Sequence, residues 1–117
     1  MYAYVGCYTT PDRDGKGNGI NVYEMDPATG AWTHVQLVED VGNPSWLTLN
    51  QSQSHLYAVS GGDHFTVVSA LARDKATGTL TYLNSQDCGS PNPVAISIST
   101  QIPYAVVAGS PARQIEP

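Results

Sequence analysis

Charged side chains are scarce in this sequence of 117 residues. Only 13% of the residues are charged, and five Lys and Arg stand against ten Asp and Glu, which gives a formal net charge of −5. A protein that binds the phosphate backbone of DNA or RNA needs a stripe or patch of basic side chains. Because the sequence contains no such stripe, we expect no nucleic-acid partner.

Long apolar runs are also missing, although 41% of the residues are hydrophobic. The apolar residues are spread along the chain, whereas a membrane-spanning helix needs about 20 consecutive ones. The first seven residues, Met1 to Cys7, lack the positively charged and apolar segments of a secretory signal. We therefore expect no membrane partner and a cytoplasmic location.

Cysteine and histidine are few. Cys7 and Cys88 lie far apart and outside any C-x-x-C spacing, which argues against a disulfide framework and a thiolate metal site. The three histidines, His34, His55 and His64, share no spacing, and we expect His34 and His55 at the surface or half-buried. A catalytic zinc site needs three protein ligands and an open position. We therefore predict no metal site and no cofactor.

What the chain does contain is an internal repeat. The segment MDPATGAW, residues 25–32, returns 48 positions later as RDKATGTL, residues 73–80. A repeat with a period of this length indicates a chain built from one recurring structural unit. Two further pairs recur at spacings of 47 to 49, and a weaker copy precedes them: Asn43-Pro44 with Asn92-Pro93, Tyr57-Ala58-Val59 with Tyr104-Ala105-Val106, and Tyr2-Ala3 with Tyr57-Ala58.

Each repeat has the pattern of short antiparallel strands. Apolar residues recur with a period of two, and Gly, Pro, Asn and Asp bound the runs. Residues 26–30 and 74–78 are predicted hairpin turns, in which Asp bonds nearby backbone and Gly takes a positive φ. The predicted strands are 2–8, 20–25, 31–38, 45–50, 55–60, 65–72, 79–84, 94–99 and 104–108.

Four short strands in about 40 to 50 residues are typical of a β-propeller blade. The sequence therefore predicts an all-β fold of about two and a half antiparallel four-stranded blades. A closed propeller needs about 4–8 blades, and a repeat covers its apolar face only against a neighbouring repeat. The predicted propeller is incomplete, and its open blade edges make self-association possible.

Several segments also match a known family in order and spacing: YVGCYTT, GINVYEMDPATGAW, GNPSWLTLN, HLYAVSGG and VSALARDKATGTL. They resemble the N-terminal third of the lactonase family of seven-bladed β-propellers, which includes bacterial 6-phosphogluconolactonases and fungal carboxymuconate cyclases. The resemblance implies a partial propeller domain over residues 1–109, followed by an irregular tail over 110–117. It also implies a hydrolase whose partner is a small-molecule sugar lactone, with ring-closing lactonisation as the chief variant.

Three departures from the family pattern bear on function. Cys7 stands where Thr is usual, and Ala95 stands where the family often has His. The tail 110–117 is flanked by prolines and breaks the strand alternation, so we expect a truncated or frameshifted version of a longer chain. The catalytic His, Arg and Glu groups of the family lie in later blades. Catalytic residues are therefore expected beyond residue 117, and the isolated chain is expected to be inactive.

Five residues are candidates for lining a substrate channel. Lactone hydrolysis needs a base or metal that activates water, and donors that hold the developing oxyanion. In a propeller these groups project at one mouth of the channel, where the entries to the inner strands and the turns after the second strands converge. The predicted strands place five side chains and the long loop 8–18 at that mouth: Asn43, Ser45, Asp63, His64 and Asn92.

Asp63 and His64 form the best local pair of titratable groups, because a carboxylate stands beside an imidazole. Adjacent residues on a strand point in opposite directions, which argues against an acid–base dyad. A solvated loop is therefore the competing interpretation of this pair.

The loop PDRDGKGNGI, residues 11–20, imitates two binding motifs. In the calcium pattern, Lys16 occupies a ligand position, and in the phosphate pattern no helix follows the glycines. A flexible inter-strand loop is the favoured interpretation. Weak calcium binding, or contact of Arg13 or Lys16 with a substrate phosphate, is the alternative.

Aromatic side chains are the last candidate binding groups. Trp32, Trp46 and the seven tyrosines have faces that suit sugar rings. Inward-facing positions in packed blades explain most of these aromatic residues without any role in sugar binding. We therefore expect core packing.

Three functions remain open at this stage. The leading one is the N-terminal part of a cytoplasmic lactonase that needs absent blades for catalysis. The second is a non-catalytic scaffold or binding propeller, which fits Ala95 in place of His. The third is a short chain that closes a ring by association, for example with three copies supplying about seven blades.

Overall fold

The computed structural model describes residues 1–11, 14–61, 67–87, 95–98, 105–108 and 113–115. Within these residues, no helix is long and apolar enough to cross a membrane. The elements are ten strands: β1 (Tyr2–Gly6), β2 (Ile20–Met25), β3 (Trp32–Val38), β4 (Pro44–Leu49), β5 (His55–Ser60), β6 (Val67–Arg73), β7 (Leu80–Asp87), β8 (Ala95–Ile98), β9 (Ala105–Ala108) and β10 (Arg113–Ile115).

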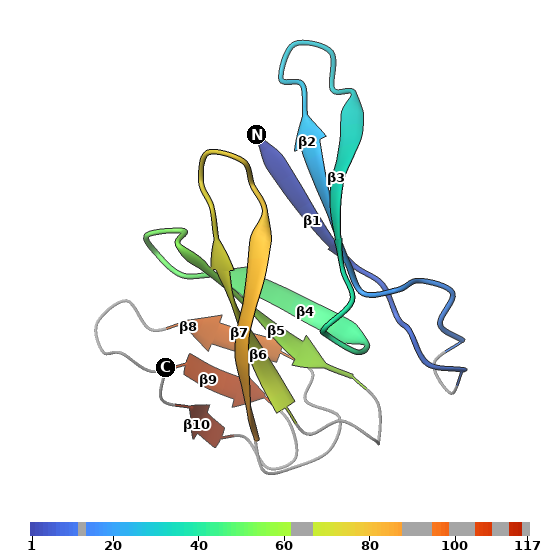
Figure 1. The fold of residues 1–117 in the computed structure, drawn as a ribbon. Helices are drawn as coiled ribbons and strands as arrows, with labels where there is room; N and C mark the ends of the chain where they lie inside the picture. Colours follow the sequence, from blue (N-terminus) through green and yellow to red (C-terminus); the bar gives the residue numbers. More distant parts are fainter. Residues whose placement is uncertain (12–13, 62–66, 88–94, 99–104, 109–112, 116–117) are drawn as a thin grey trace.

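The strands form three antiparallel sheets in chain order (Figure 1). The first sheet is β1-β2-β3, the second is β4-β5-β6-β7, and the third is β8-β9-β10. The nine predicted strands all occur, with boundaries shifted by at most a few residues. The predicted all-β fold of blade-like sheets is confirmed.

The sequence repeat is also a repeat of strand register. The pairing of β2 with β3 shifts by one residue between Val22 and Tyr23, and the pairing of β6 with β7 shifts between Ala70 and Leu71, 48 positions later. A β-bulge at the same place in two hairpins bends and twists both in the same way. The first and second sheets therefore share one outer hairpin design, in which Trp32 corresponds to Leu80 and Tyr23 to Leu71.

The weaker N-terminal copy of the repeat aligns with β5 two residues away from the predicted position. Tyr4 pairs with Val22, and Tyr57 pairs with Ala70, which is the counterpart of Val22. Tyr4 is therefore the counterpart of Tyr57, and the predicted match of Tyr2 with Tyr57 is wrong by two residues. A shift of two keeps every side chain on the same face of the strand, so the alternating pattern alone does not distinguish the two alignments.

The two predicted hairpin turns have the same internal hydrogen bonds. The Asp26 and Asp74 carboxylates accept hydrogen bonds from the backbone N–H groups of Ala28 at 2.8 Å and Ala76 at 2.9 Å. Gly30 and Gly78 donate their N–H groups to the carbonyls of Asp26 and Asp74 at 2.7 Å each. Their φ angles of 76° and 74° lie in the left-handed region that favours glycine. The predicted reason for the recurring segment is confirmed.

The hydrophobic core lies between the first and second sheets. The first sheet and the segment after it contribute apolar side chains from one face, and the second sheet contributes those that meet them. Buried side chains of this size each stabilise the fold by about 1.5–3 kcal/mol. The core residues are Ile20, Val22, Val38, Val41, Leu56, Ala58, Leu71 and Leu80.

Hydrogen bonds tether the outer parts of these two sheets. The hydroxyl of Tyr4 donates to the carbonyl of Gly78 at 2.7 Å and accepts from Nε of Arg73 at 2.7 Å. The hydroxyl of Tyr2 donates to the carbonyl of Ala76 at 2.9 Å. The Gln36 amide bonds both the N–H and the C=O of Leu80 at 2.8 Å, as a neighbouring strand would. The hairpin turn of the second sheet is thus fixed on β1.

The structure corrects two further expectations. Arg113–Ile115 form β10, which pairs with β9, although the tail 110–117 was expected to be irregular. Strand pairing uses backbone groups, so the free edge of β9 accepts a short segment without apolar alternation. The two tryptophans are also not core residues, since Trp32 is 52% exposed and Trp46 is 49% exposed.

The Tyr2 contact makes a prediction about the two turn glycines. A Cβ at Gly78 would overlap the Tyr2 ring, whereas a Cβ at Gly30 would meet nothing within 4 Å. Both positions have a positive φ, so Gly30→Ala should cost about 1–2 kcal/mol from backbone strain alone. Gly78→Ala should cost roughly 1–3 kcal/mol more, because the Tyr2 ring must leave its place on the turn to admit the methyl group. Urea denaturation of the two variants measures the difference, and equal losses would contradict the docking of this turn on β1.

Candidate functional site

Three chain segments converge at the end of the sheets where β4 begins. Loop 7–19 connects β1 to β2, segment 39–43 leads into β4, and Gly61 follows β5. Asn43 joins all three. Its backbone carbonyl accepts a hydrogen bond from the N–H of Gly61 at 2.8 Å, and its backbone N–H donates to the hydroxyl of Thr9 at 3.2 Å. Three of the segments predicted at the channel mouth therefore meet at Asn43, and their place at a channel mouth stays a prediction.

The Asn43 side chain completes this junction. Its carbonyl oxygen accepts from the N–H groups of Thr9 at 2.7 Å and Thr10 at 3.1 Å. Its amide nitrogen donates to the hydroxyl of Thr10 at 2.7 Å and to the carbonyl of Gly61 at 3.1 Å. Both donors are used, and the residue is 0% exposed. Asn43 therefore positions the three segments and has no donor left for a ligand.

The backbone of Asn43 explains why asparagine occupies this position. Its φ of 43° is left-handed, a conformation that Asn tolerates better than most residues. The carboxamide then reaches backbone groups of loop 7–19 and of Gly61, which are distant in sequence. Asparagine therefore supplies both the left-handed backbone of the turn and the hydrogen bonds to the neighbouring segments.

Ser45 has a different environment from Asn43. It is half-buried, and its hydroxyl makes one long hydrogen bond of 3.4 Å to the carbonyl of Val59. It lines a groove of about 450 Å³ between residues 4–6 of β1 and residues 44–47 of β4. A second groove of about 320 Å³ lies further along β4 and shares Tyr4 and Leu47 with the first. The hydroxyl of Ser45 is thus placed where a small molecule can reach it.

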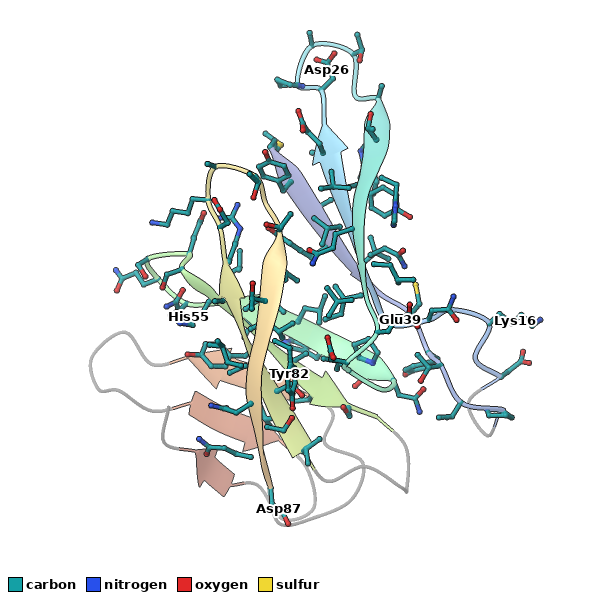
Figure 2. All side chains as sticks on the ribbon, in the orientation of Figure 1. Lys16, Asp26, Glu39, His55, Tyr82 and Asp87 are labelled. Carbon is teal, nitrogen blue, oxygen red and sulfur yellow. The ribbon has the colours of Figure 1, made fainter. Side chains whose placement is uncertain are left out.

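The other three candidates lie outside the described residues. They are Asp63, His64 and Asn92, and a channel role for them stays a prediction. Arg13 is also outside, whereas Lys16 of the same loop is described. Lys16 lies 3.9 Å from the Asp14 carboxylate, and both side chains are highly exposed at the end of the loop (Figure 2).

The histidine and cysteine side chains that the structure describes have polar neighbours. Nε2 of His34, which is exposed, lies 3.0 Å from the Asn21 side-chain oxygen, and Nδ1 of the half-buried His55 lies 2.8 Å from the Ser54 hydroxyl. The predicted positions of both histidines are confirmed. Sγ of Cys7 accepts from the Asn21 amide at 3.6 Å. Within the described part of the chain, no three His, Cys, Asp or Glu side chains gather as metal ligands would.

Sequence reasoning missed several residues of this site. Thr9 and Thr10 hold the Asn43 carboxamide, and Tyr4 and Trp46 line the grooves. Thr9, Thr10 and Tyr4 lie in YVGCYTT and Trp46 lies in GNPSWLTLN, two segments that carry the family resemblance, but neither segment assigned them a role. Both aromatic residues were expected in the core; Tyr4 does pack against it, whereas Trp46 does not.

These sheets, repeated in register and packed face to face, define part of a β-propeller. The family model described as "Lactonase, 7-bladed beta-propeller" matches residues 2–110, and the chain therefore belongs to this lactonase family.

Curated relatives support the same assignment. The chain is 32% identical over 105 residues to a 6-phosphogluconolactonase of Bacillus subtilis, covering 90% of this chain and 29% of that protein. It is 31% identical over 107 residues to a 6-phosphogluconolactonase of Formosa agariphila, covering 90% of this chain and 30% of that protein. The chain thus spans less than a third of the length of these relatives.

A solved structure shows the shared fold. The chain matches a periplasmic gluconolactonase of Pseudomonas aeruginosa with a TM-score of 0.76 and 27% sequence identity. The match covers 91% of this chain and 30% of the gluconolactonase. The three sheets therefore correspond to part of a larger propeller of the same family.

The junction at Asn43 yields a second prediction. Asn43→Gly keeps the left-handed backbone but removes the carboxamide, so buried groups of Thr9, Thr10 and Gly61 lose their partner. We expect a loss of roughly 2–4 kcal/mol in the free energy of unfolding, measured by urea denaturation. Ser45→Ala is the matched control and should cost less than about 1 kcal/mol. Similar losses for both variants would show that the carboxamide is not the junction.

Proposed function

We propose that this chain is the N-terminal portion of a sugar-lactone hydrolase of the 6-phosphogluconolactonase type, and that catalysis requires the remainder of the propeller. The observation that carries the proposal is the match of 90% of the chain to two proteins named 6-phosphogluconolactonase. The match spans 29% and 30% of those proteins, so most of each relative has no counterpart among these 117 residues. The chain supplies one side of a substrate site.

The chemistry of lactone opening supports the proposal that catalytic groups lie in the remainder of the propeller. Water attacks the ring carbonyl, a tetrahedral oxyanion forms, and the ring C–O bond breaks as the alkoxide takes a proton. The step needs a base that accepts a proton from water and donors aimed at the oxyanion. The residues that line the two grooves include hydroxyl groups, but no carboxylate or imidazole. The grooves can bind a polyhydroxylated ring and do not by themselves provide a base.

The described side chains fit a binding role at the channel. Trp46 is half exposed at the groove, where its aromatic face can contact the carbons of a sugar ring. The hydroxyls of Ser45 and Thr48 line the same two grooves, and each can exchange hydrogen bonds with ring hydroxyls. Asn43 acts indirectly, by fixing loop 7–19 beside the entry to β4. A small-molecule sugar lactone is the proposed partner.

A non-catalytic scaffold is the second candidate function. Ala95, the first residue of β8, stands where the family often carries His, and this substitution favours the alternative. A ring-closing, lactonising enzyme of the carboxymuconate cyclase type is a variant within the same family. A cytoplasmic location stays a prediction, since one structural match is a periplasmic protein.

The third prediction concerns activity of the isolated chain. Purified residues 1–117 should hydrolyse 6-phosphogluconolactone no faster than buffer does, because the groove supplies no base. Acid release followed at constant pH measures the rate. Hydrolysis well above buffer that disappears in His64→Ala would refute the proposal and place a catalytic group in this chain.

The scaffold alternative requires the complete protein. A chain extended to the length of the relatives should hydrolyse sugar lactones if the enzyme proposal is right. If it neither binds nor turns over phosphorylated or free sugar lactones in titration calorimetry and rate measurements, the scaffold function is correct. Binding without turnover would identify a binding module and would also contradict the enzyme proposal.

A further inference from the structure

The end of loop 7–19 leaves no room for a side chain at two of its positions. A Cβ at Gly17 would overlap the Cβ of Cys7, and a Cβ at Gly19 would overlap the backbone carbonyl oxygen of Val38. Gly19 also has a φ of 131°, which side-chain-bearing residues rarely adopt. The fold therefore requires glycine at position 19.

The residue between these two glycines is Asn18, which is exposed. It is the only asparagine of the sequence that a glycine follows. In such an Asn-Gly step, the backbone nitrogen of the glycine can attack Cγ of the asparagine side chain, and the missing Cβ lowers the steric barrier to this approach. Asparagine belongs to the chemically labile residues of proteins. The glycine that the fold requires thus places a reactive step in the loop.

The two reacting groups are accessible to each other. Among the described residues, no hydrogen bond holds the Asn18 carboxamide or the N–H of Gly19. The loop has a comparable step at Asp14-Gly15, but there the N–H of Gly15 donates to the carbonyl of Thr10 at 2.9 Å. That hydrogen bond engages the nitrogen that would have to attack. Asn18-Gly19 is therefore the more reactive of the two steps.

The other described asparagines lack these conditions. The carboxamides of Asn21 and Asn50 are held by hydrogen bonds at both their oxygen and their nitrogen. Asn43 is buried and precedes Pro44, whose nitrogen has no proton to lose. Asn84 is exposed, but it lies within β7 and the next residue carries a side chain. The structure thus singles out Asn18.

We propose that Asn18 is a site of spontaneous deamidation, with water as the only co-reactant. The backbone nitrogen of Gly19 forms a bond to Cγ of Asn18 and loses its proton, and the side-chain nitrogen leaves as ammonia. Water then opens the cyclic imide. Cleavage of the bond to Cγ gives aspartate, and cleavage of the bond to the backbone carbonyl carbon gives isoaspartate. This inference goes beyond the proposed function, because it does not depend on lactone chemistry.

The isoaspartate product alters the backbone between two fixed points of the loop. On one side of residue 18, the N–H of Gly17 donates to the carbonyl of Tyr8 at 3.1 Å. On the other side, the carbonyl of Gly19 accepts from the N–H of Cys7 at 2.9 Å. In isoaspartate the main chain runs through the side-chain carbons and is one atom longer. The two hydrogen bonds then no longer match the chain between them, so loop 7–19 is held less firmly.

Mass mapping of aged protein tests the site. The purified chain is kept at mildly alkaline pH in water labelled with heavy oxygen, and trypsin, which cleaves after Lys16, separates residue 18 from Asp14-Gly15. The peptide with residue 18 should lose the amide nitrogen and gain one heavy oxygen. Protein isoaspartyl methyltransferase with labelled S-adenosylmethionine should methylate the same peptide. An unchanged peptide after ageing overturns the proposal.

A matched pair of variants identifies the reacting residue. Asn18→Gln should lose the methylation, because glutamine would have to close a larger ring. Asn84→Gln is the control, since Asn84 is also exposed, and its methylation should equal that of the parent chain. Gly19 stays unchanged in both, because a side chain there would not fit the fold. Methylation that persists in Asn18→Gln and disappears in Asn84→Gln would refute the assignment.

Asn18→Asp separates the new charge from the backbone change. The freshly purified variant has the carboxylate, near Glu39 at the base of the loop (Figure 2), but a backbone of normal length. Its urea midpoint should match that of the parent chain, because exposed charges interact weakly. The isoaspartate fraction of aged protein, isolated by anion exchange, should unfold at lower urea. Equal midpoints for this fraction and the parent, or an equal loss in Asn18→Asp, would contradict the proposed effect on the loop.

Discussion

Every level of this structure depends on one constraint, that a β-sheet of this repeat cannot cover its own apolar face. The contact of Ile20 and Val22 with Leu71 and Leu80 satisfies the constraint once, between the first and second sheets. Buried side chains of this kind supply most of the free energy that favours folding. The tyrosine hydroxyls and the Gln36 amide add direction to that contact, since they bond specific backbone groups of the second sheet. Apolar burial holds the sheets together, and these hydrogen bonds set their relative position.

Much of the fold could be predicted from sequence because its signals are local. The turn phrase Asp-x-Ala-Thr-Gly specifies a backbone conformation that needs Gly at its fifth position and Asp at its first. The strands follow from alternation between such turns. The displacement of β1 by two residues was not predictable, because strand alternation is unchanged by a shift of two. Only the pairing of Tyr4 with Val22 distinguishes the two alignments.

The sequence indicated which chain segments meet at the candidate site, but not which side chains hold them together. The convergence of loop 7–19, segment 39–43 and the turn after β5 follows from blade topology. The saturation of the Asn43 carboxamide depends on the distances to Thr9, Thr10 and Gly61, which no sequence pattern contains. The exposure of Trp32 was missed for another reason. An aromatic residue at an inward position is buried only if a neighbouring sheet is present, and the sequence pattern is the same in both cases.

The incompleteness of the proposed substrate site and the exposure of Trp32 have a common physical origin. A propeller channel is assembled from the inner strands of several sheets, so a chain with three sheets presents one wall of it. The same shortage of neighbours leaves Trp32 in water while its counterpart Leu80 is buried. A sheet added beside Trp32 would bury this ring and, in the proposed propeller, would also add another inner strand around the channel. The number of neighbouring sheets therefore decides both how complete the proposed channel wall is and how much apolar surface of the first sheet is exposed.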